Sequence, residues 1–190
     1  EQMQKAVPVG QGSMAAVLGL ADDVVKDICA KASDLGVVEA VNFNTPGQVV
    51  IAGEVEALKK AMQLATEAGA RRALQLKVSG PFHSSLMKPA ADALKVRLEE
   101  VEVKAPSIPV LHNIDVKTRT DAKDIKEALA AQAASAVLWA ETVREMAKLG
   151  VTMIYECGPG AALSGMVKRI TPDVKAMALN SQKALAEAAE

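Results

Sequence analysis

The sequence has few of the residues that build disulfide-rich proteins or zinc proteins. It contains one Trp, one Tyr, two Phe, two Cys and two His among 190 residues. Cys29 and Cys157 lie far apart and form no CxxC pair, so neither a disulfide framework nor a structural zinc site is indicated. We therefore expect no metal centre and a reducing, cytoplasmic environment.

An excess of charge of one sign is also missing. The 22 Lys and Arg residues almost balance 23 Asp and Glu residues, and neither sign forms a long block. This balance argues against a protein that binds nucleic acid or a membrane surface. No apolar run approaches the roughly 20 residues of a membrane-spanning helix. With 50% hydrophobic residues, the chain is predicted to form one or two globular domains with small-molecule or protein partners.

Three segments repeat one pattern, in which an amphipathic helix closed by glycine is followed by an apolar strand. The helices end at Gly36, Gly69 and Gly150, where glycine can adopt a left-handed cap. The strand after Gly150, VTMIYEC, is apolar almost throughout, as in sheets that are covered on both faces. The repeated pattern predicts an α/β fold with a parallel sheet.

Residues 13–77 form a self-contained pattern of strands and helices. Its order, β-α-β-β-α-β, is that of a ferredoxin-like unit. The turn Asn44-Thr45-Pro46-Gly47 between the two central strands predicts a hairpin, because proline presets φ and glycine tolerates positive φ. The predicted strands are 14–18, 37–43, 48–52 and 72–77, and the predicted helices are 22–35 and 54–68.

The rest of the chain predicts fewer strands than a covered sheet needs. Helices are expected at 86–101 and 121–134, the second capped by Asp121, and one short strand at Ile108–His112. Together with the strand after Gly150, this makes only two strands. We therefore expect that this half takes strands from elsewhere or that part of its sheet lies outside the sequence.

His83 is the first candidate for chemistry. It stands in Val78-Ser79-Gly80-Pro81-Phe82-His83-Ser84-Ser85, after a predicted strand and before a helix that Ser84 or Ser85 can cap. A strand-to-helix loop is a common catalytic position, and an imidazole with a pKa of about 6.5 is a suitable base near neutral pH. The alternative is a loop histidine bonded to backbone, and the residues alone leave both open.

A nucleophile to accompany this base is not evident. No serine stands in a G-x-S-x-G elbow. Cys157 ends an apolar strand before Gly158-Pro159-Gly160 and a helix start, which lowers a thiol pKa, but a buried structural cysteine is the more common case at a strand end. The glycine turn also resembles an anion cradle, although it lacks the G-x-G-x-x-G spacing. His112, Trp139 and Phe43 are expected to be structural.

Four pieces of the sequence resemble one family in order and spacing. They are GSMAAVLGL, VNFNTPGQVVIAG, VSGPFHSSLMKPA and YECGPGAALSGMVKRI. The chain is similar to the C-terminal two-thirds of bacterial malonyl-CoA:acyl carrier protein transacylases. The resemblance implies an α/β-hydrolase-like acyltransferase core with an inserted ferredoxin-like subdomain. On this basis residues 1–12 lead out of the core, 13–77 are the subdomain and 78–190 are the C-terminal part of the core.

The resemblance also implies an activity and residue roles. The family transfers malonyl from malonyl-CoA to the thiol of acyl carrier protein through a serine ester, without a further cofactor. His83 would be the base, oriented by the backbone carbonyl of Gln132, and Phe82 would crowd an α-methyl branch. Met14 and Asn44 match positions that line the substrate pocket, and Ala162, where the glycine turn enters its helix, is expected to border the same pocket. The family's serine, carboxylate-binding arginine and oxyanion donors would precede Glu1, so the chain alone is expected to be inert, and the full-length protein to be a monomer.

Two other functions remain open from the sequence. One is a non-catalytic ferredoxin-like module that binds acyl carrier protein through Arg71, Arg72, Lys168 and Arg169. The other is a thiol acyltransferase that uses Cys157 with His83.

Overall fold

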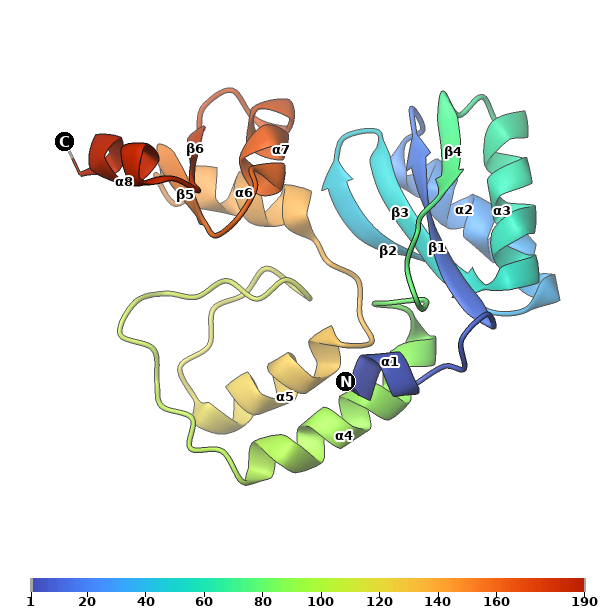
Figure 1. Cartoon of the computed structure of the whole chain (residues 1–190), viewed down its shortest axis with the longest axis horizontal. Coiled ribbons are helices and arrows are strands. Elements are labelled where there is room, and N and C mark those ends of the chain that lie inside the picture. Colours follow the sequence, from blue (N-terminus) through green and yellow to red (C-terminus); the bar gives the residue numbers. More distant parts are fainter. Residues whose placement is uncertain (1, 190) are drawn as a thin grey trace.

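A four-stranded sheet forms the right-hand part of the molecule in Figure 1, a computed structural model that describes residues 2–189. Its strands lie in the order β2-β3-β1-β4, and each neighbouring pair is antiparallel. The elements are β1 Gly12–Leu18, α2 Asp22–Ala32, β2 Val38–Thr45, β3 Gln48–Glu54, α3 Val55–Glu67 and β4 Arg72–Gln75, with a short helix α1 at Gln2–Lys5 and a 3₁₀ turn η1 at Ser33–Leu35.

The parallel pairing predicted for this part from the helix-glycine-strand pattern is wrong. Each helical crossover does return the chain in the same direction, from β1 to β2 and from β3 to β4. However, β3 lies between β1 and β2, and β1 lies between β3 and β4. Strands of equal direction are therefore never neighbours, and every hydrogen-bonded pair is antiparallel.

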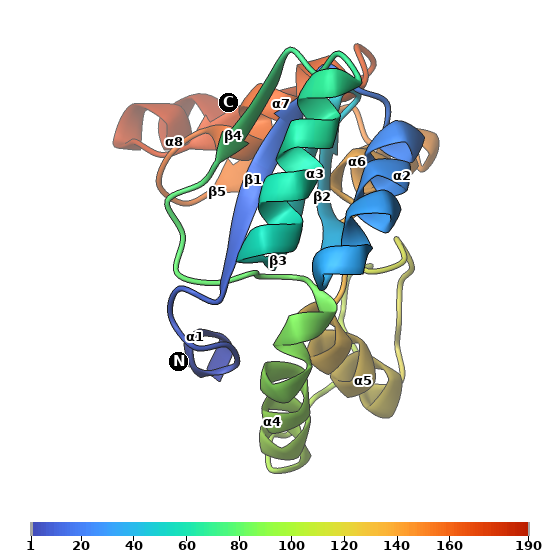
Figure 2. The same ribbon diagram turned by 90° about the vertical axis from the view of Figure 1, so that its right-hand side faces the viewer.

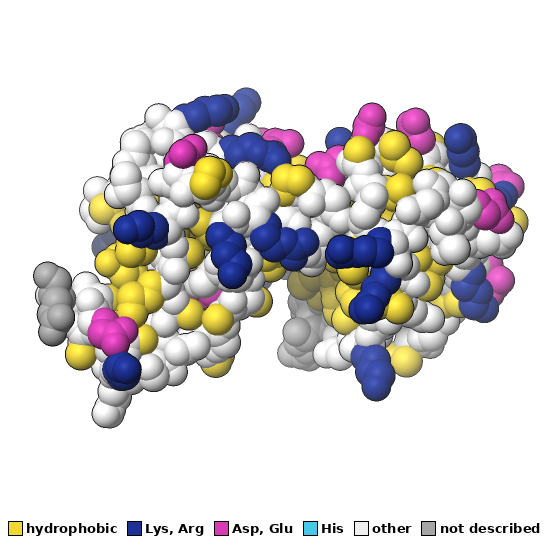
Figure 3. All heavy atoms as spheres, turned by 90° about the horizontal axis from the view of Figure 1, so that it is seen from above, with side chains coloured by type: hydrophobic (Ala, Val, Ile, Leu, Met, Phe, Trp, Pro, Cys, Tyr) yellow, Lys and Arg dark blue, Asp and Glu magenta, His cyan; other side chains and the backbone are white. Residues whose placement is uncertain are grey.

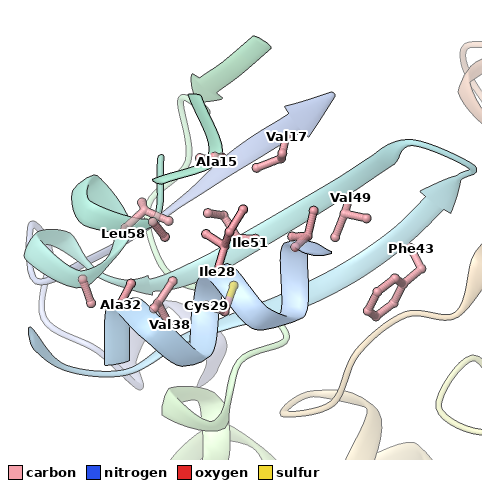
Figure 4. Close-up of a cluster of buried hydrophobic side chains, with 14 residues drawn as sticks. Ala15, Val17, Ile28, Cys29, Ala32, Val38, Phe43, Val49, Ile51 and Leu58 are labelled. Atoms are coloured by element: carbon pink, nitrogen blue, oxygen red, sulfur yellow. The ribbon is translucent and has the colours of Figure 1, made fainter. Parts of the chain in front are cut away.

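One face of this sheet is covered by α2 and α3, as Figure 2 shows. Their apolar sides meet the sheet in a buried cluster around Ile28, Ile51 and Leu58, drawn in Figure 4. The predicted hairpin between β2 and β3 is confirmed, with Gly47 at a φ of +73°. The opposite face of the sheet carries a second cluster of Met14, Val41, Val50 and Ala52, against which Phe82 packs.

Two helices that follow the four-stranded sheet in the chain pack against each other. The 3₁₀ turn η2 Ser85–Met87 leads into α4 Lys88–Glu99, and α5 Ala122–Gln132 lies alongside α4 (Figure 1). The predicted cap of α5 is confirmed, because the Asp121 carboxylate accepts hydrogen bonds from the backbone N–H groups of Lys123 and Asp124.

The strand predicted at Ile108–His112 is wrong. Among the described residues this segment forms only an isolated bridge between Leu111 and Thr118. Ile108 is 71% exposed, and Pro109 has no backbone donor for a ladder. Without a neighbouring strand, an apolar run of this length has no hydrogen-bonding partner that holds it extended.

The C-terminal part contains α6 Trp139–Lys148, β5 Met153–Cys157, α7 Ala162–Ile170, β6 Lys175–Leu179 and α8 Gln182–Ala188. β5 pairs in parallel with β6, so the predicted parallel geometry is confirmed here, although β6 itself was not predicted. Contrary to the expectation that both faces of β5 are covered, its alternate residues Met153, Tyr155 and Cys157 are exposed. None of the helices within residues 2–189 is long and apolar enough to cross a membrane.

The connection between α5 and α6 is bound to the free edge of β2. The N–H of Val137 donates to the carbonyl of Val41 over 2.8 Å, and the N–H of Phe43 donates to the carbonyl of Val137 over 2.9 Å. Since α5 ends only five residues earlier, at Gln132, this pair of bonds fixes the end of α5 relative to the sheet.

Candidate active site

His83 lies in the loop that leaves β4 and enters η2. Its φ is +65°, a left-handed conformation that few residues other than glycine adopt and that is often associated with functional sites. The residues on both sides of His83 are fixed. Pro81 is fully buried, and the buried Ser84 hydroxyl donates to the Pro81 carbonyl over 2.6 Å. The backbone around His83 is therefore held in an unfavourable conformation by its surroundings.

The expectation that a serine side chain caps the following helix is wrong. Ser84 occupies the position before η2, but its hydroxyl bonds Pro81 and makes no cap. The backbone N–H of Ser85 donates instead to Oε2 of Glu39 on β2, over 2.7 Å. A carboxylate from a distant strand takes the place of the local serine.

The ring of His83 is paired with a backbone carbonyl. Nδ1 lies 3.2 Å from the carbonyl oxygen of Gln132, the last residue of α5, where helix carbonyls have no partner within the helix. A carbonyl can only accept, so this contact selects the neutral tautomer in which Nδ1 carries the proton. Nε2 then has a free lone pair, which is the state that a general base requires.

The ring also borders a hollow of about 480 Å³ on the surface. Its lining combines methionine and aromatic side chains with a few amides and the imidazole, the mixture found in small-molecule sites. The lining residues are Met3, Gln4, Met14, Asn42, Phe82 and His83.

The structure brings two of the four proposed substrate-binding residues together with the candidate base and leaves the other two apart. Met14, Phe82 and His83 share the hollow, whereas Asn44 and Ala162 do not line it. Asn42 stands there instead of Asn44, on a strand whose register shifts twice, between Ala40 and Asn42 and between Phe43 and Thr45. Ala162 is exposed at the start of α7.

Sequence reasoning missed Met3, Gln4 and Asn42 as lining residues. Gln4 comes from α1 and its amide donates to the Ser79 hydroxyl over 3.0 Å, a contact between segments 75 residues apart. Asn42 belongs to the VNFNTPGQ piece, which was the one available signal.

Cys157 and the glycine turn after it lie outside this site. The cysteine is exposed at the end of β5, contrary to the expected burial, and does not line the hollow. The amides at the start of α7 are already occupied, because the Glu156 carboxylate accepts from Ser164 N–H over 2.8 Å and Leu163 N–H over 3.1 Å. Bonds from Ser164, Leu163 and Ala162 hold the pKa of Glu156 below its usual value. The Glu156 carboxylate therefore occupies the position in which the glycine turn would cradle an anion.

His112 is buried, in agreement with a structural role. Burial lowers its pKa and the Arg119 charge lowers it further, while Asp115 acts in the opposite direction. Its backbone joins a local turn through bonds to Lys117 and Val116. Across residues 2–189, no group of three or more His, Cys, Asp or Glu side chains is arranged to hold a metal ion.

An acyltransferase is the class of protein that this base, hollow and α/β fold suit. A model of the acyl transferase domain matches residues 1–185, and the chain belongs to that family. It is 49% identical over 178 residues to the malonyl CoA-acyl carrier protein transacylase of Haemophilus influenzae, covering 94% of this chain and 57% of the relative. The corresponding Escherichia coli protein is 48% identical over 188 residues, covering 99% of this chain and 61% of the relative.

Solved structures agree with these sequence relatives. An acyl-carrier-protein S-malonyltransferase from Burkholderia pseudomallei superposes with a TM-score of 0.96 at 54% identity, covering 98% of this chain and 61% of that chain. A malonyl-transacylase in complex with its type II PKS acyl-carrier protein also gives a TM-score of 0.96, at 45% identity, covering 98% and 60%. The chain thus spans about three-fifths of the length of the relatives it matches.

Proposed function

We propose that this chain supplies the histidine base for transfer of a malonyl group from malonyl-CoA to the thiol of acyl carrier protein. The observation that carries the proposal is the His83 ring at the rim of the hollow, with Nδ1 held by the Gln132 carbonyl. The names of the relatives support the reaction, since they are transacylases and S-malonyltransferases.

In the proposed first half-reaction, Nε2 of His83 takes the proton of a serine hydroxyl while the serine oxygen attacks the malonyl thioester carbonyl. The C–S bond then breaks, and the imidazolium returns the proton to the departing coenzyme A sulfur. In the second half-reaction the carrier-protein thiol gives its proton to Nε2, and its sulfur displaces the serine oxygen, which recovers the proton. The scheme needs malonyl-CoA and the carrier-protein thiol as substrates and no cofactor.

The serine of this scheme is assigned to a segment outside the 190 residues, because none of their serines stands in a G-x-S-x-G elbow. Gln132 serves as an orienting acceptor through its backbone, and Phe82 limits the space beside the malonyl α-carbon. We assign Met14, which lines the same hollow as Phe82, to the substrate pocket as well. Asn44 stays assigned to the wider pocket by family position only, and Ala162 by its place after the glycine turn.

The same proposal covers the domain organisation. Residues 13–77 would be a ferredoxin-like subdomain set into an α/β-hydrolase-like core, with 1–12 leading out of that core and 78–190 forming its C-terminal part. The strand order β2-β3-β1-β4 supports the subdomain, and the parallel β5–β6 pair supports the core.

Acyl carrier protein is the partner that we propose for the basic end of the sheet. Leu18 pairs with both Gln48 and Arg72, and the Arg169 guanidinium donates to Gln48 Oε1 over 2.9 Å. This geometry brings Arg72 and Arg169 to one end of the sheet, beside Arg71 and Lys168. Figure 3 looks onto the corresponding side and shows Lys and Arg side chains crossing the middle of the molecule. We further propose a cytoplasmic protein that is a monomer at full length.

The two alternatives are not favoured. A thiol acyltransferase needs Cys157 beside His83, and Cys157 does not line the hollow. A binding module without catalysis would have no use for a histidine held in a left-handed conformation against a carbonyl.

The test uses the 190-residue chain and a chimaera in which the part of the Escherichia coli transacylase that this chain does not match is joined ahead of residue 1. We expect no malonyl ester on the chain alone by mass spectrometry, and malonyl transfer by the chimaera. His83→Ala in the chimaera should lower kcat by about 10²- to 10⁴-fold, the usual contribution of a general base. A chimaera whose malonyl transfer is unaffected by His83→Ala would refute the assignment.

A further inference from the structure

We propose that Glu39, on the edge strand β2, is a positioning residue for His83. It holds the His83 loop in the position that places the ring against the Gln132 carbonyl. This inference rests on the proposed function of His83 as base. Glu39 does not line the hollow, so it does not act by direct contact with a substrate bound there.

The first observation is that a side chain from a distant strand binds the loop directly after His83. Ser84 spends its hydroxyl on the carbonyl of Pro81, before the histidine. On the other side, the Glu39 carboxylate binds the N–H of Ser85 over 2.7 Å. A bond between a carboxylate and a backbone amide is charge-assisted and stronger than a neutral one, so it can stabilise the left-handed φ of +65° at His83.

The second observation is that the acceptor of the His83 ring is fixed to the same strand. Val137, which follows α5, exchanges hydrogen bonds with Val41 and Phe43 of β2 over 2.8 and 2.9 Å. Glu39 lies on β2 two residues before Val41. One strand therefore holds the histidine loop through a side chain and the end of α5 through its backbone.

Loss of the Glu39 bond would free only one of these two connections. The Gln132 carbonyl would stay in place, while the loop could relax out of the left-handed conformation and move the ring. We therefore expect the ring to lose its preferred tautomer and the chimaera to lose kcat, with the KM for malonyl-CoA unchanged because the substitution replaces no residue that lines the hollow. Cap bonds of this kind correspond to about a 3- to 30-fold change in an equilibrium or rate.

The tautomer of the His83 ring can be observed in the 190-residue chain itself by ¹⁵N NMR. The chain has two histidines, and the imidazole of His112 serves as the internal reference. The native chain should show the tautomer with Nδ1 protonated at His83. Glu39→Ala and Glu39→Asp, the second of which keeps the charge but is one methylene shorter, should both shift His83 toward a mixture of tautomers. Glu39→Gln keeps an oxygen acceptor of the same reach without the charge and should retain most of the native pattern. The Asp variant decides the question if the Ala variant does not fold.

Glu54→Ala is the matched control. The Glu54 carboxylate also accepts a backbone N–H over 2.7 Å, that of Val37, which precedes β2 and does not belong to the His83 loop. It should leave the His83 ring and kcat unchanged. A native His83 signal in folded Glu39→Ala or Glu39→Asp would overturn the proposal, as would an equal effect of Glu54→Ala.

The kinetic arm is measured in the chimaera. We expect kcat to fall by about 3- to 30-fold for Glu39→Ala, KM to stay constant and Glu39→Gln to recover most of the rate. An inactive unsubstituted chimaera would count against the proposed function only, since the NMR arm would still show whether Glu39 positions the ring.

Discussion

Nδ1 of His83 lies 3.2 Å from the backbone carbonyl of Gln132, although 49 residues separate them in the chain. The acceptor is a neutral dipole at the end of a helix. It orients the ring without a carboxylate, so no charged side chain has to be desolvated beside the ring. The arrangement also makes the orienting group independent of the side chain at position 132.

Substitution of Gln132 should therefore have little effect. Gln132→Ala keeps the carbonyl and the helix that presents it, so we expect kcat of the chimaera to change by less than about threefold, against the 10²- to 10⁴-fold loss expected when a general base itself is removed. Steady-state kinetics of the two variants side by side checks this. A loss for Gln132→Ala comparable to that for His83→Ala would mean that the side-chain amide acts on the ring.

Phe82 should control which acyl group is accepted. It lines the hollow next to His83, and removal of its ring in Phe82→Ala opens space for an α-methyl branch. A methyl group in a tight pocket corresponds to about a 10- to 200-fold preference, and we expect the variant to lose most of it. The ratio of kcat/KM for malonyl-CoA and methylmalonyl-CoA is the measurement, with Phe82→Tyr as the control that keeps the ring and the preference.

Charge reversal at the basic end of the sheet should weaken binding of acyl carrier protein. We expect Arg72→Glu with Lys168→Glu to raise the Kd of the 190-residue chain about tenfold or more at low salt, where like charges repel. The difference should shrink toward 1 M salt, where the Debye length is about 3 Å. Lys123→Glu on α5 is the control. Equal weakening by Lys123→Glu would show that only net charge matters.

The two cysteines should differ in reactivity toward alkylating reagents. Burial raises the pKa of the Cys29 thiol to about 12, and the Glu39 charge adds to this effect, so Cys29 stays protonated and enclosed. Cys157 is exposed. At neutral pH we expect iodoacetamide to label Cys157 and to leave Cys29 unlabelled until the protein unfolds, as peptide mass spectrometry would show. Labelling of Cys29 in the folded chain would contradict its packing.

His112 should make the protein less stable in mild acid. Its pKa in the folded state is lowered from 6.5, chiefly by burial, so below about pH 6.5 the unfolded chain binds a proton that the folded chain does not. Stability then falls as pH falls from 7 to 5, by at most about 1.4 kcal/mol per pH unit for one proton.

Urea unfolding of the native chain and of His112→Asn tests this pH dependence. The Asp115 pKa is lowered by its bond to Arg119, so that carboxylate stays charged over the measured range and adds no slope. We expect His112→Asn to show a smaller loss of stability between pH 7 and pH 5. If the free energy of unfolding of His112→Asn fell by as much as that of the native chain between pH 7 and pH 5, His112 would be excluded as the source of the pH dependence.

Local patterns in the sequence predicted most helices, the β2–β3 hairpin and the Asp121 cap, because these depend on side-chain periodicity and turn chemistry within a few residues. They also placed His83 in a strand-to-helix loop. The same reasoning failed at Ile108–His112, where apolar residues were not enough without a partner strand, and at Cys157, whose exposure depends on what covers β5. It misplaced the capping of η2, since the Glu39 carboxylate comes from 46 residues away.

The sequence by itself determined an α/β chain, because helix and strand periodicity is local, and its resemblance to the acyltransferase family marked His83 as a candidate base. Only the tertiary structure decided which groups surround that histidine. The carbonyl of Gln132 reaches the ring from α5, the carboxylate of Glu39 reaches its loop from β2, and Asn42 of the same strand lines the hollow. Their meeting depends on strand order and on the register of β2, which non-local hydrogen bonds set and no short stretch of residues specifies.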